Sequence, residues 1–201
     1  MRTGIILCGG RSSRFGKDKA LLTIDGVPMV RRMVGRISQV VDKTIIAARD
    51  SAQRESLAAI SAVPDGAEVV FDPVRGYGPV AGILAGLSAS KSEYSICLAC
   101  DLPYVNPDAI DALFGCAEAN TNDAAIPKHP DGTLEPLHAV YGRSMIGACR
   151  DAMSRGEHTI RGAISLLENV VFVPTESLRR FDPDLRTFLN LNYPEDLGVM
   201  A

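Results

Sequence analysis

Residues 4–20 have the sequence Gly4-Ile5-Ile6-Leu7-Cys8-Gly9-Gly10-Arg11-Ser12-Ser13-Arg14-Phe15-Gly16-Lys17-Asp18-Lys19-Ala20. The apolar run from Ile5 to Cys8 predicts a buried strand that ends abruptly in a glycine-containing loop. Glycines let backbone N–H groups approach a ligand closely. Backbone donors and cations at the end of a strand favour a polyphosphate site over a solvated basic turn. The cations in this loop are Arg11, Arg14, Lys17 and Lys19.

Two common phosphate motifs do not fit this loop. A Walker A loop has four residues between its first glycine and the Gly-Lys pair, followed by Ser or Thr. Here five residues separate Gly10 from Gly16, and Asp18 follows Lys17. The dinucleotide fingerprint G-x-G-x-x-G requires glycine where Arg11 stands. The loop therefore matches neither motif.

The composition of the chain is that of an ordinary globular protein. A length of 201 residues suits one α/β domain, which we expect to span residues 1–201. The net charge of −3 predicts no nucleic-acid partner. We find no signal peptide and no apolar run of membrane-spanning length, and we expect a cytoplasmic protein without a membrane partner. The five cysteines, an odd number, indicate reduced thiols.

Strand and helix patterns alternate along the chain, which predicts βα units and a largely parallel sheet. Helical patterns start near residues 28, 52, 79, 107, 145 and 159. We expect residues 175–184 to form a loop and residues 188–197 to form a short strand that continues into a final helix. The other predicted strands cover residues 5–8, 44–48, 68–71, 94–99, 124–127, 137–141 and 170–173.

The opening segment, residues 7–22, closely resembles the signature of MobA-like nucleotidyltransferases, the molybdenum cofactor guanylyltransferases. Their pattern is roughly L-A-G-G-x-S-x-R-M-G-x-D-K-A-L, and here Cys8 and Phe15 replace the usual Ala and Met. The resemblance implies a Rossmann-like α/β fold, a three-layer sandwich with a mostly parallel central sheet of the nucleotide-diphospho-sugar transferase type.

Asp101 follows the apolar strand predicted at residues 94–99. Ligands of open α/β sheets collect at the carboxyl ends of strands, and a carboxylate opposite a phosphate loop suits Mg²⁺. The alternative is that Asp101 only ends the strand and caps the next segment. Residues 100–103 have the sequence Cys-Asp-Leu-Pro, which resembles the family motif C-D-x-P, whose Asp binds the metal.

Two further segments resemble family motifs. Residues 78–82 are similar to G-P-L-A-G, which implies that Asp72 contacts the nucleotide and that Gly78 and Gly82 line a cleft shared with the second substrate. Without the resemblance, this segment is equally well an ordinary loop and helix start. Residues 188–197 resemble F-x-N-x-N-T-P-E-D-L. On a strand, Asn190 and Asn192 would point to one face and bind a polar ligand together, or Asn192 would only help a turn.

Two residues depart from the family pattern, and the cysteines and histidines argue against other kinds of site. Ala48 stands where the family often has a nucleotide-binding Asn, and Tyr193 replaces a better helix cap. Cys97 and Cys100 are three apart on a strand, so they face opposite sides and do not chelate a metal together. The three histidines lack metal-ligand spacing, and we assign no catalytic role to His138.

The resemblance implies transfer of GMP from GTP to molybdopterin or the molybdenum cofactor, giving pyrophosphate, with Mg²⁺ on Asp101. Cofactor-delivery proteins and apo-molybdoenzymes are further implied partners. The attacking pterin phosphate is already ionised, so positioning and charge neutralisation suffice. The implied catalytic residues are Lys19, Arg14 and Asp101, and the implied nucleotide-binding residues are Leu7, Cys8, Gly9, Gly10, Lys19, Asp72 and Asp101.

Base choice depends on Gly9, which has no side chain and leaves room for a purine, whereas cytidylyl relatives tend to have Ala-Ala-Gly in this turn. Alternative functions are therefore a cytidylyl- or sugar-phosphate nucleotidyltransferase. A catalytically weak nucleotide-binding assembly partner is an alternative of a different class. Magnesium-dependent release of pyrophosphate would separate the enzymes from the assembly partner.

Overall fold

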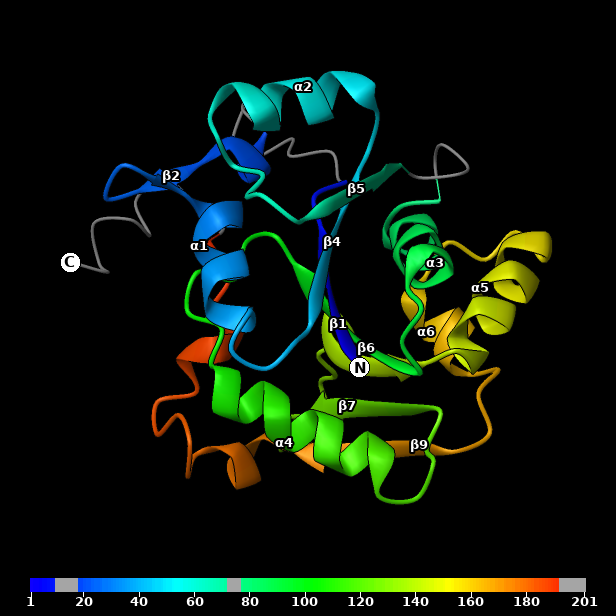
Figure 1. Cartoon of the computed structure of the whole chain (residues 1–201). Coiled ribbons are helices and arrows are strands. Elements are labelled where there is room, and N and C mark those ends of the chain that lie inside the picture. Colours follow the sequence, from blue (N-terminus) through cyan, green and yellow to red (C-terminus); the bar gives the residue numbers. More distant parts are fainter. Residues whose placement is uncertain (10–17, 72–76, 192–201) are drawn as a thin grey trace.

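The computed structural model describes residues 1–9, 18–71 and 77–191. In these residues a seven-stranded sheet has the order β5-β4-β1-β6-β8-β7-β9 (Figure 1). Only β8 is antiparallel to its neighbours among these strands, so the predicted mostly parallel sheet is confirmed. The strands are β1 (Arg2–Leu7), β4 (Lys43–Ala48), β5 (Glu68–Phe71), β6 (Tyr94–Ala99), β7 (Ala124–Lys128), β8 (His138–Gly142) and β9 (Val170–Pro174).

Strand β1 lies between β4 and β6, and Ile5 pairs with Ile45 on one side and with Cys97 on the other. The chain builds β4 and β5 on one side of β1 and then crosses to β6 on the other side. The carboxyl ends of β1 and β6 therefore form a topological switch point, where open α/β sheets bind ligands. Gly9 and Asp101 both follow strands that end at this edge of the sheet.

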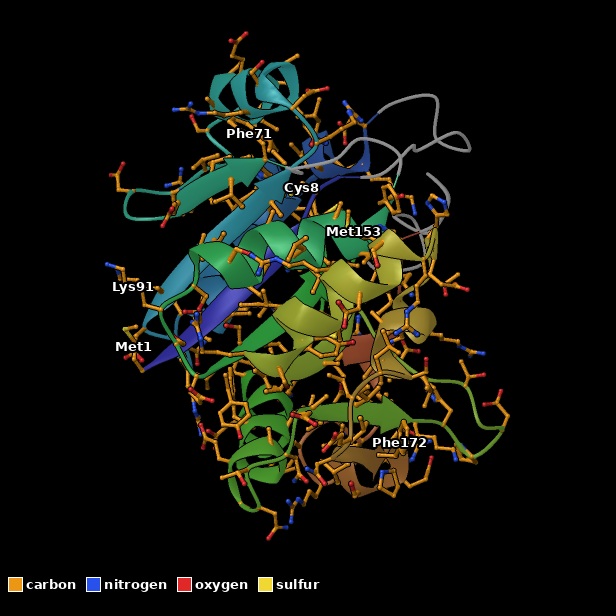
Figure 2. The ribbon with its side chains drawn as sticks, turned by 90° about the vertical axis from the view of Figure 1, so that its right-hand side faces the viewer. Met1, Cys8, Phe71, Lys91, Met153 and Phe172 are labelled. Atoms are coloured by element: carbon orange, nitrogen blue, oxygen red, sulfur yellow. The ribbon has the colours of Figure 1, made fainter. Side chains whose placement is uncertain are left out.

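Helices cover both faces of the sheet, as the predicted three-layer sandwich requires (Figure 1). Successive β1 residues alternate between the two apolar clusters, with Ile6 in one and Ile5 in the other. Figure 2 views the molecule from the side covered by α3 and α5. The first face packs α1 (Met29–Ile37), α2 (Ser51–Ala59) and α4 (Pro107–Glu118); the second packs α3 (Pro79–Ala89), α5 (Ser144–Ser154) and α6 (Ile160–Ile164).

Helix α4 shows how local sequence fixes an element. The Asn106 side chain accepts a hydrogen bond from the Ala109 N–H at 3.0 Å, and Pro107 occupies the first turn, as its sequence predicts. Phe114 is fully buried on the sheet-facing side. Replacing a buried Phe by Ala typically costs about 3–5 kcal/mol, so this packing outweighs the cap.

The predicted strand at residues 188–197 is wrong for its described part. Arg186–Phe188 form a short 3-10 helix, η3, and residues 189–191 have no regular structure. The left-handed φ of 52° at Leu185 turns the chain just before η3, and the Phe188 N–H then donates to the Leu185 carbonyl at 3.1 Å. The loop predicted at residues 175–184 likewise begins with a 3-10 helix, η2 (Thr175–Leu178).

The sequence pattern also missed a small hairpin, β2 (Thr23–Ile24) with β3 (Val27–Pro28). Asp25 and Gly26 have φ values of 52° and 75°, as a two-residue Asp-Gly hairpin turn requires. The helix expected from residue 28 onward therefore starts at Met29 as α1 and ends at Ile37, before Val41.

The two cysteines of the C-x-x-C sequence face opposite sides of the sheet, as predicted. Cys97 belongs to the apolar cluster under α3 and α5, and Cys100 to the cluster under α1 and α4. All five cysteines lie in the described part of the chain and are free thiols. Among the described helices, none has the length and apolar character needed to cross a membrane.

Candidate nucleotide site

Lys19 and Asp101 meet at the carboxyl ends of β1 and β6. Lys19 Nζ lies 3.0 Å from Asp101 Oδ2, and both side chains are 18% exposed. The other carboxylate oxygen, Asp101 Oδ1, is buried and has no hydrogen-bond partner among the described residues. The structure thus brings together two predicted site residues and leaves one oxygen of the Asp101 carboxylate without a hydrogen bond from the described residues.

Local backbone interactions hold both residues in place. Asp18 caps the 3-10 helix η1 (Lys19–Leu21), because its Oδ1 accepts a hydrogen bond from the Ala20 N–H at 3.1 Å. The Cys100 N–H donates to the Leu7 carbonyl at 3.2 Å and extends the β1–β6 pairing to the residue before Asp101. Lys19 and Asp101 are therefore attached to ordered backbone.

A cavity of about 220 Å³ lies beside the pair. Ligand pockets usually measure about 300–1,000 Å³, so this cavity can hold only part of a nucleotide. Gly10, Arg14 and Asp72, three further predicted site residues, lie outside the described residues. The lining residues are Leu7, Cys8, Gly9, Asp18, Lys19, Pro79, Ala99, Cys100, Asp101 and Leu137.

The Cys8 thiol is neutral at physiological pH. A hydrogen bond with the Cys100 side chain, followed by burial, raises the pKa of Cys8 well above the usual value for a thiol. A neutral, buried thiol is a poor nucleophile and a poor metal ligand. Cys8 can therefore contact a ligand through its backbone groups and by packing, but not as a nucleophile or a metal ligand.

The amino end of α3 borders the same cavity through Pro79. Gly78 precedes it with φ of 56° and ψ of −139°, a backbone conformation that residues other than glycine rarely adopt. Tyr77 holds the segment that leads into α3. Its hydroxyl donates to the Met153 carbonyl at 3.2 Å, and its ring stacks on His158. Gly82 is buried within α3 and is not among the residues that line the cavity.

Residues 189–191 approach Asp101 through a backbone hydrogen bond. The Leu191 N–H donates to the Asp101 carbonyl at 2.9 Å, so residues 189–191 lie against the turn that carries Asp101. Asn190 is exposed and belongs to no strand, which makes the predicted strand geometry for its amide wrong. Its partner in that prediction, Asn192, lies outside the described residues.

His138, at the start of β8, is fully buried. Burial lowers its pKa to about 3, so the ring is neutral near pH 7. Its Nε2 lies 3.4 Å from the Thr187 hydroxyl, and the ring packs edge-on against Phe188. Within residues 1–9, 18–71 and 77–191, its Nδ1 has no hydrogen-bond partner. These contacts show His138 as a packed core residue.

Gln53 contributes to the structure of this site, although the sequence pattern did not indicate it. Its side chain is buried and hydrogen-bonds to both Cys8 and Asp18, the residues next to Gly9 and Lys19. It belongs to α2, whose apolar pattern is weak, so nothing in the sequence distinguished it from a surface residue. Ala48, at the end of β4, is buried and has no polar side-chain group.

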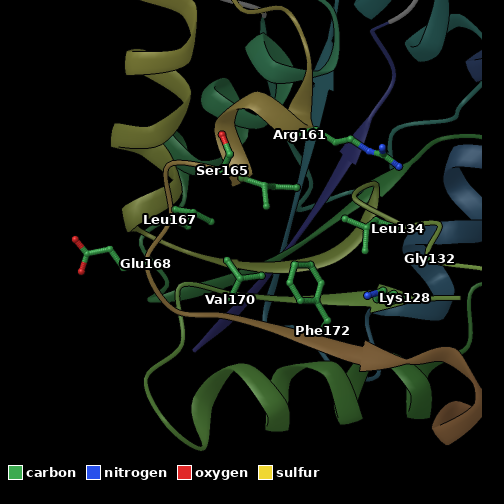
Figure 3. Close-up of a pocket in the computed structure, with 10 residues that line it drawn as sticks. Lys128, Gly132, Leu134, Arg161, Ser165, Leu167, Glu168, Val170 and Phe172 are labelled. Carbon is green, nitrogen blue, oxygen red and sulfur yellow. The ribbon is translucent and has the colours of Figure 1, made fainter. Parts of the chain in front are cut away.

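A larger hollow of about 540 Å³ runs along β9 and α6 (Figure 3). Figure 3 shows Leu134, Val170 and Phe172 pointing into it, with Lys128 and Arg161 nearby. It shares no lining residue with the cavity beside Lys19 and Asp101. No predicted site residue lines it.

Comparisons with known proteins agree with this geometry. Residues 4–171 match the family model described as "MobA-like NTP transferase domain". A protein of Methanosarcina mazei named "Probable molybdenum cofactor guanylyltransferase" is 41% identical, over 99% of this chain and 89% of its own length. "Molybdenum cofactor guanylyltransferase" of Syntrophotalea carbinolica is 31% identical, over 96% of this chain and 88% of its own.

A crystal structure of molybdopterin-guanine dinucleotide biosynthesis protein A from Archaeoglobus fulgidus has the same fold. It aligns with a TM-score of 0.84 and 32% identity, over 99% of this chain and 96% of that one. The family match spans β1 through most of the sheet and includes both Lys19 and Asp101. The chain therefore belongs to the MobA-like NTP transferase domain family.

Proposed function

We propose that this protein is a nucleotidyltransferase that transfers GMP from GTP to molybdopterin or the molybdenum cofactor, releasing pyrophosphate. We further propose that residues 1–201 act as one nucleotidyltransferase domain. Support comes from relatives at 41% and 31% identity that carry the guanylyltransferase name. The observation that carries the proposal is the Lys19–Asp101 pair beside a cavity at the switch point of the sheet.

The proposed reaction is a displacement at phosphorus. An oxygen of the acceptor's terminal phosphate attacks the α-phosphorus of GTP, and the bond from that phosphorus to the α–β bridging oxygen breaks. The attacking phosphate is ionised near pH 7, so no side chain has to remove a proton. The protein's part is to orient the two phosphates and to neutralise charge on the departing pyrophosphate.

Lys19 is proposed to supply that positive charge. Its side chain is 18% exposed, lines the cavity and is paired with Asp101, so the ammonium is oriented towards a ligand bound there. Arg14 is proposed as a second cation on sequence grounds, because it belongs to the loop that joins Gly9 to Lys19. The backbone of Leu7, Cys8 and Gly9 would contact the nucleotide from the cavity wall.

Nucleotide transfer of this type uses a divalent cation, and Asp101 fits the part of its protein ligand. Its buried Oδ1 receives no hydrogen bond from the part of the chain that the structure describes, and carboxylate oxygens are the ligands that Mg²⁺ prefers. Within the described ranges, no three His, Cys, Asp or Glu side chains gather to hold a metal ion. Mg²⁺ typically takes one or two carboxylates, with phosphates and water completing its shell. When bound, it would add positive charge between the phosphates.

Guanine is the proposed base, because Gly9 lines the cavity without a side chain. A CTP-using or sugar-phosphate-specific enzyme and a weakly active assembly partner are the competing functions. Cofactor-delivery proteins and apo-molybdoenzymes are proposed as further partners. A cytoplasmic location is proposed from the five free thiols.

The deciding experiment is a titration with GTP, CTP, ATP and UTP in the presence of Mg²⁺. We expect GTP to bind most tightly, and we expect Asp101→Asn to weaken this binding and its dependence on Mg²⁺. Asp151→Asn, an exposed carboxylate on α5, is the matched control. GTP- and acceptor-dependent release of pyrophosphate then tests transfer. Preference for CTP or UTP would reject guanine, and nucleotide binding without release of pyrophosphate would favour the catalytically weak assembly partner.

A further inference from the structure

The side chain of Gln53 joins three separate segments beneath the nucleotide site. It is only 2% exposed. Its Nε2 donates to the Cys8 carbonyl at 2.9 Å and to Asp18 Oδ2 at 2.6 Å, while its Oε1 accepts from the Arg49 N–H at 2.7 Å. One amide thus contacts the end of β1, the residue before Lys19, and the residue after β4.

The backbone of Gln53 is fixed as firmly as its side chain. Asp50 caps α2, and its Oδ1 accepts a hydrogen bond from the Gln53 N–H at 2.9 Å. A buried amide that loses a partner costs about 1–3 kcal/mol, so the three side-chain hydrogen bonds strongly restrict the rotamer. Gln53 is therefore a rigid connector between these segments.

The two atoms that receive the Gln53 amide protons lie on either side of the glycine- and cation-containing segment. Cys8 immediately precedes Gly9, and Asp18 immediately precedes Lys19. A single amide nitrogen that bonds to both fixes the distance between the two ends of this segment. Arg49 also approaches Asp18 Oδ2, at 3.6 Å, but its side chain is 42% exposed and the contact is longer.

The connection continues to Lys19 through Asp18. One oxygen of the Asp18 carboxylate accepts from Gln53, and the other caps η1 through the Ala20 N–H. Since η1 begins with Lys19, the orientation of this carboxylate sets the direction from which the lysine reaches Asp101. A change at Gln53 would therefore alter the position of the Lys19 ammonium through Asp18.

We propose that Gln53 is a positioning residue of the nucleotide site, which holds Cys8 and Asp18 together so that Lys19 is presented to the phosphates. The proposal rests on the proposed nucleotidyl transfer. Gln53 acts through Asp18 and contacts no reacting atom. This positioning role explains why the Gln53 amide is buried next to the site, although the sequence pattern indicated only the opening loop and Asp101 as site residues.

Gln53→Glu is the sharpest test, because it replaces the donor NH₂ by an oxygen of nearly the same size. At neutral pH the new carboxylate faces the Asp18 carboxylate and the Cys8 carbonyl, and we expect kcat to fall at least about tenfold with a smaller change in KM for GTP. In the described part of the chain, Arg49 approaches Asp18 and pairs with Asp50, and both of these charged side chains are common to the two proteins.

The pH profile separates positioning from general damage. The adjacent Asp18 carboxylate raises the pKa of a glutamate at position 53, so acidification converts it into a carboxylic acid that can donate one of the two hydrogen bonds made by the amide. We expect the ratio of wild-type to Gln53→Glu activity to fall as the pH decreases from 8 to about 5.5. A ratio that is constant over this range would contradict the proposal.

A reciprocal pair provides rescue. In Asp18→Asn with Gln53→Glu, the amide at position 18 can donate to the carboxylate at position 53, while its oxygen still caps η1. The net charge of the chain equals that of the wild type. We expect the double variant to be more active than Gln53→Glu alone. Gln39→Glu, at an exposed glutamine, is the control that should behave as wild type.

Amide hydrogen exchange without nucleotide keeps this test independent of the proposed function. We expect faster exchange at residues 18–22 in Gln53→Glu than in wild type or Gln39→Glu, with unchanged exchange in β6. If wild type releases no pyrophosphate but this difference is seen, the proposed function fails and the positional role of Gln53 stands. Unchanged exchange together with wild-type kcat would overturn the role of Gln53.

Discussion

Lys19 Nζ and Asp101 Oδ2 lie 3.0 Å apart, although 82 positions separate these residues in the chain. The pairing is possible because β1 and β6 are neighbouring parallel strands, so their carboxyl ends lie side by side. An ion pair between half-buried groups is weak evidence for stability. The pair lies at the switch point of the sheet, and the second Asp101 oxygen has no hydrogen-bond partner in the described structure, so a functional role explains the pair better than stability does.

Replacing Lys19 by Ala should lower turnover at least about tenfold, because the departing pyrophosphate loses a cation that is already oriented. Binding of GTP should weaken less than turnover falls, and the thermal midpoint should change little, because the pair is partly exposed. Pyrophosphate release and a thermal melt measure the two effects. Lys91→Ala is the matched control, since Lys91 is exposed and lies far from Cys8 (Figure 2). Near-normal turnover in Lys19→Ala would remove the lysine from the mechanism.

The layers and the strand directions could be predicted because their cause is local. Apolar runs such as residues 94–99, separated by helical patterns, leave few arrangements other than a mostly parallel sheet. The place of Asp101 could be predicted as well, because it closely follows the strand at residues 94–99, whose end lies at the ligand-binding edge. Lys19 could be assigned to the same edge because it belongs to the segment that follows the first strand.

Features that depend on tertiary contacts could not be predicted. Gln53 gains its importance from Cys8 and Asp18, which are 45 and 35 positions away. Asn190 was expected on a strand by its spacing, but the turn at Leu185 and the bond from Leu191 to Asp101 hold this segment in an irregular form. Sequence periodicity carries no information about such bonds.

The Cys8 thiol should react slowly with iodoacetamide. Its pKa is raised by the hydrogen bond with Cys100 and by burial, so the thiolate fraction at pH 8 is very small. We expect alkylation of Cys8 at least about tenfold slower than that of the half-buried Cys116 in the native protein. Peptide mass spectrometry can follow both sites. Comparable rates in denaturant serve as the control, and comparable rates in the native state would contradict this environment for Cys8.

His138 should make the protein sensitive to acid. Its folded pKa is about 3, below the ordinary value of 6.5, so at low pH the unfolded chain binds a proton that the folded chain does not. The associated stability is complete above pH 6.5 and decreases as the pH falls from about 6.5 towards 3, with a slope of up to about 1.4 kcal/mol per pH unit. Denaturant unfolding at several pH values should show a shallower decrease for His138→Leu. The exposed His158, changed to Leu, should keep the wild-type slope.

Two glycines should respond in opposite ways to replacement by Ala. Gly78 has φ of 56° and open space around the position of a Cβ, so only backbone strain, about 1–3 kcal/mol, opposes the substitution. Because Gly78 leads into α3 at the cavity, Gly78→Ala should also weaken GTP binding. Gly35 lies in α1 with ordinary helical backbone and equally open space, so Gly35→Ala should stabilise by about 0.5–1 kcal/mol. Denaturant unfolding and GTP titration of both variants test this contrast, and equal effects on stability would show that the conformation at Gly78 carries no strain.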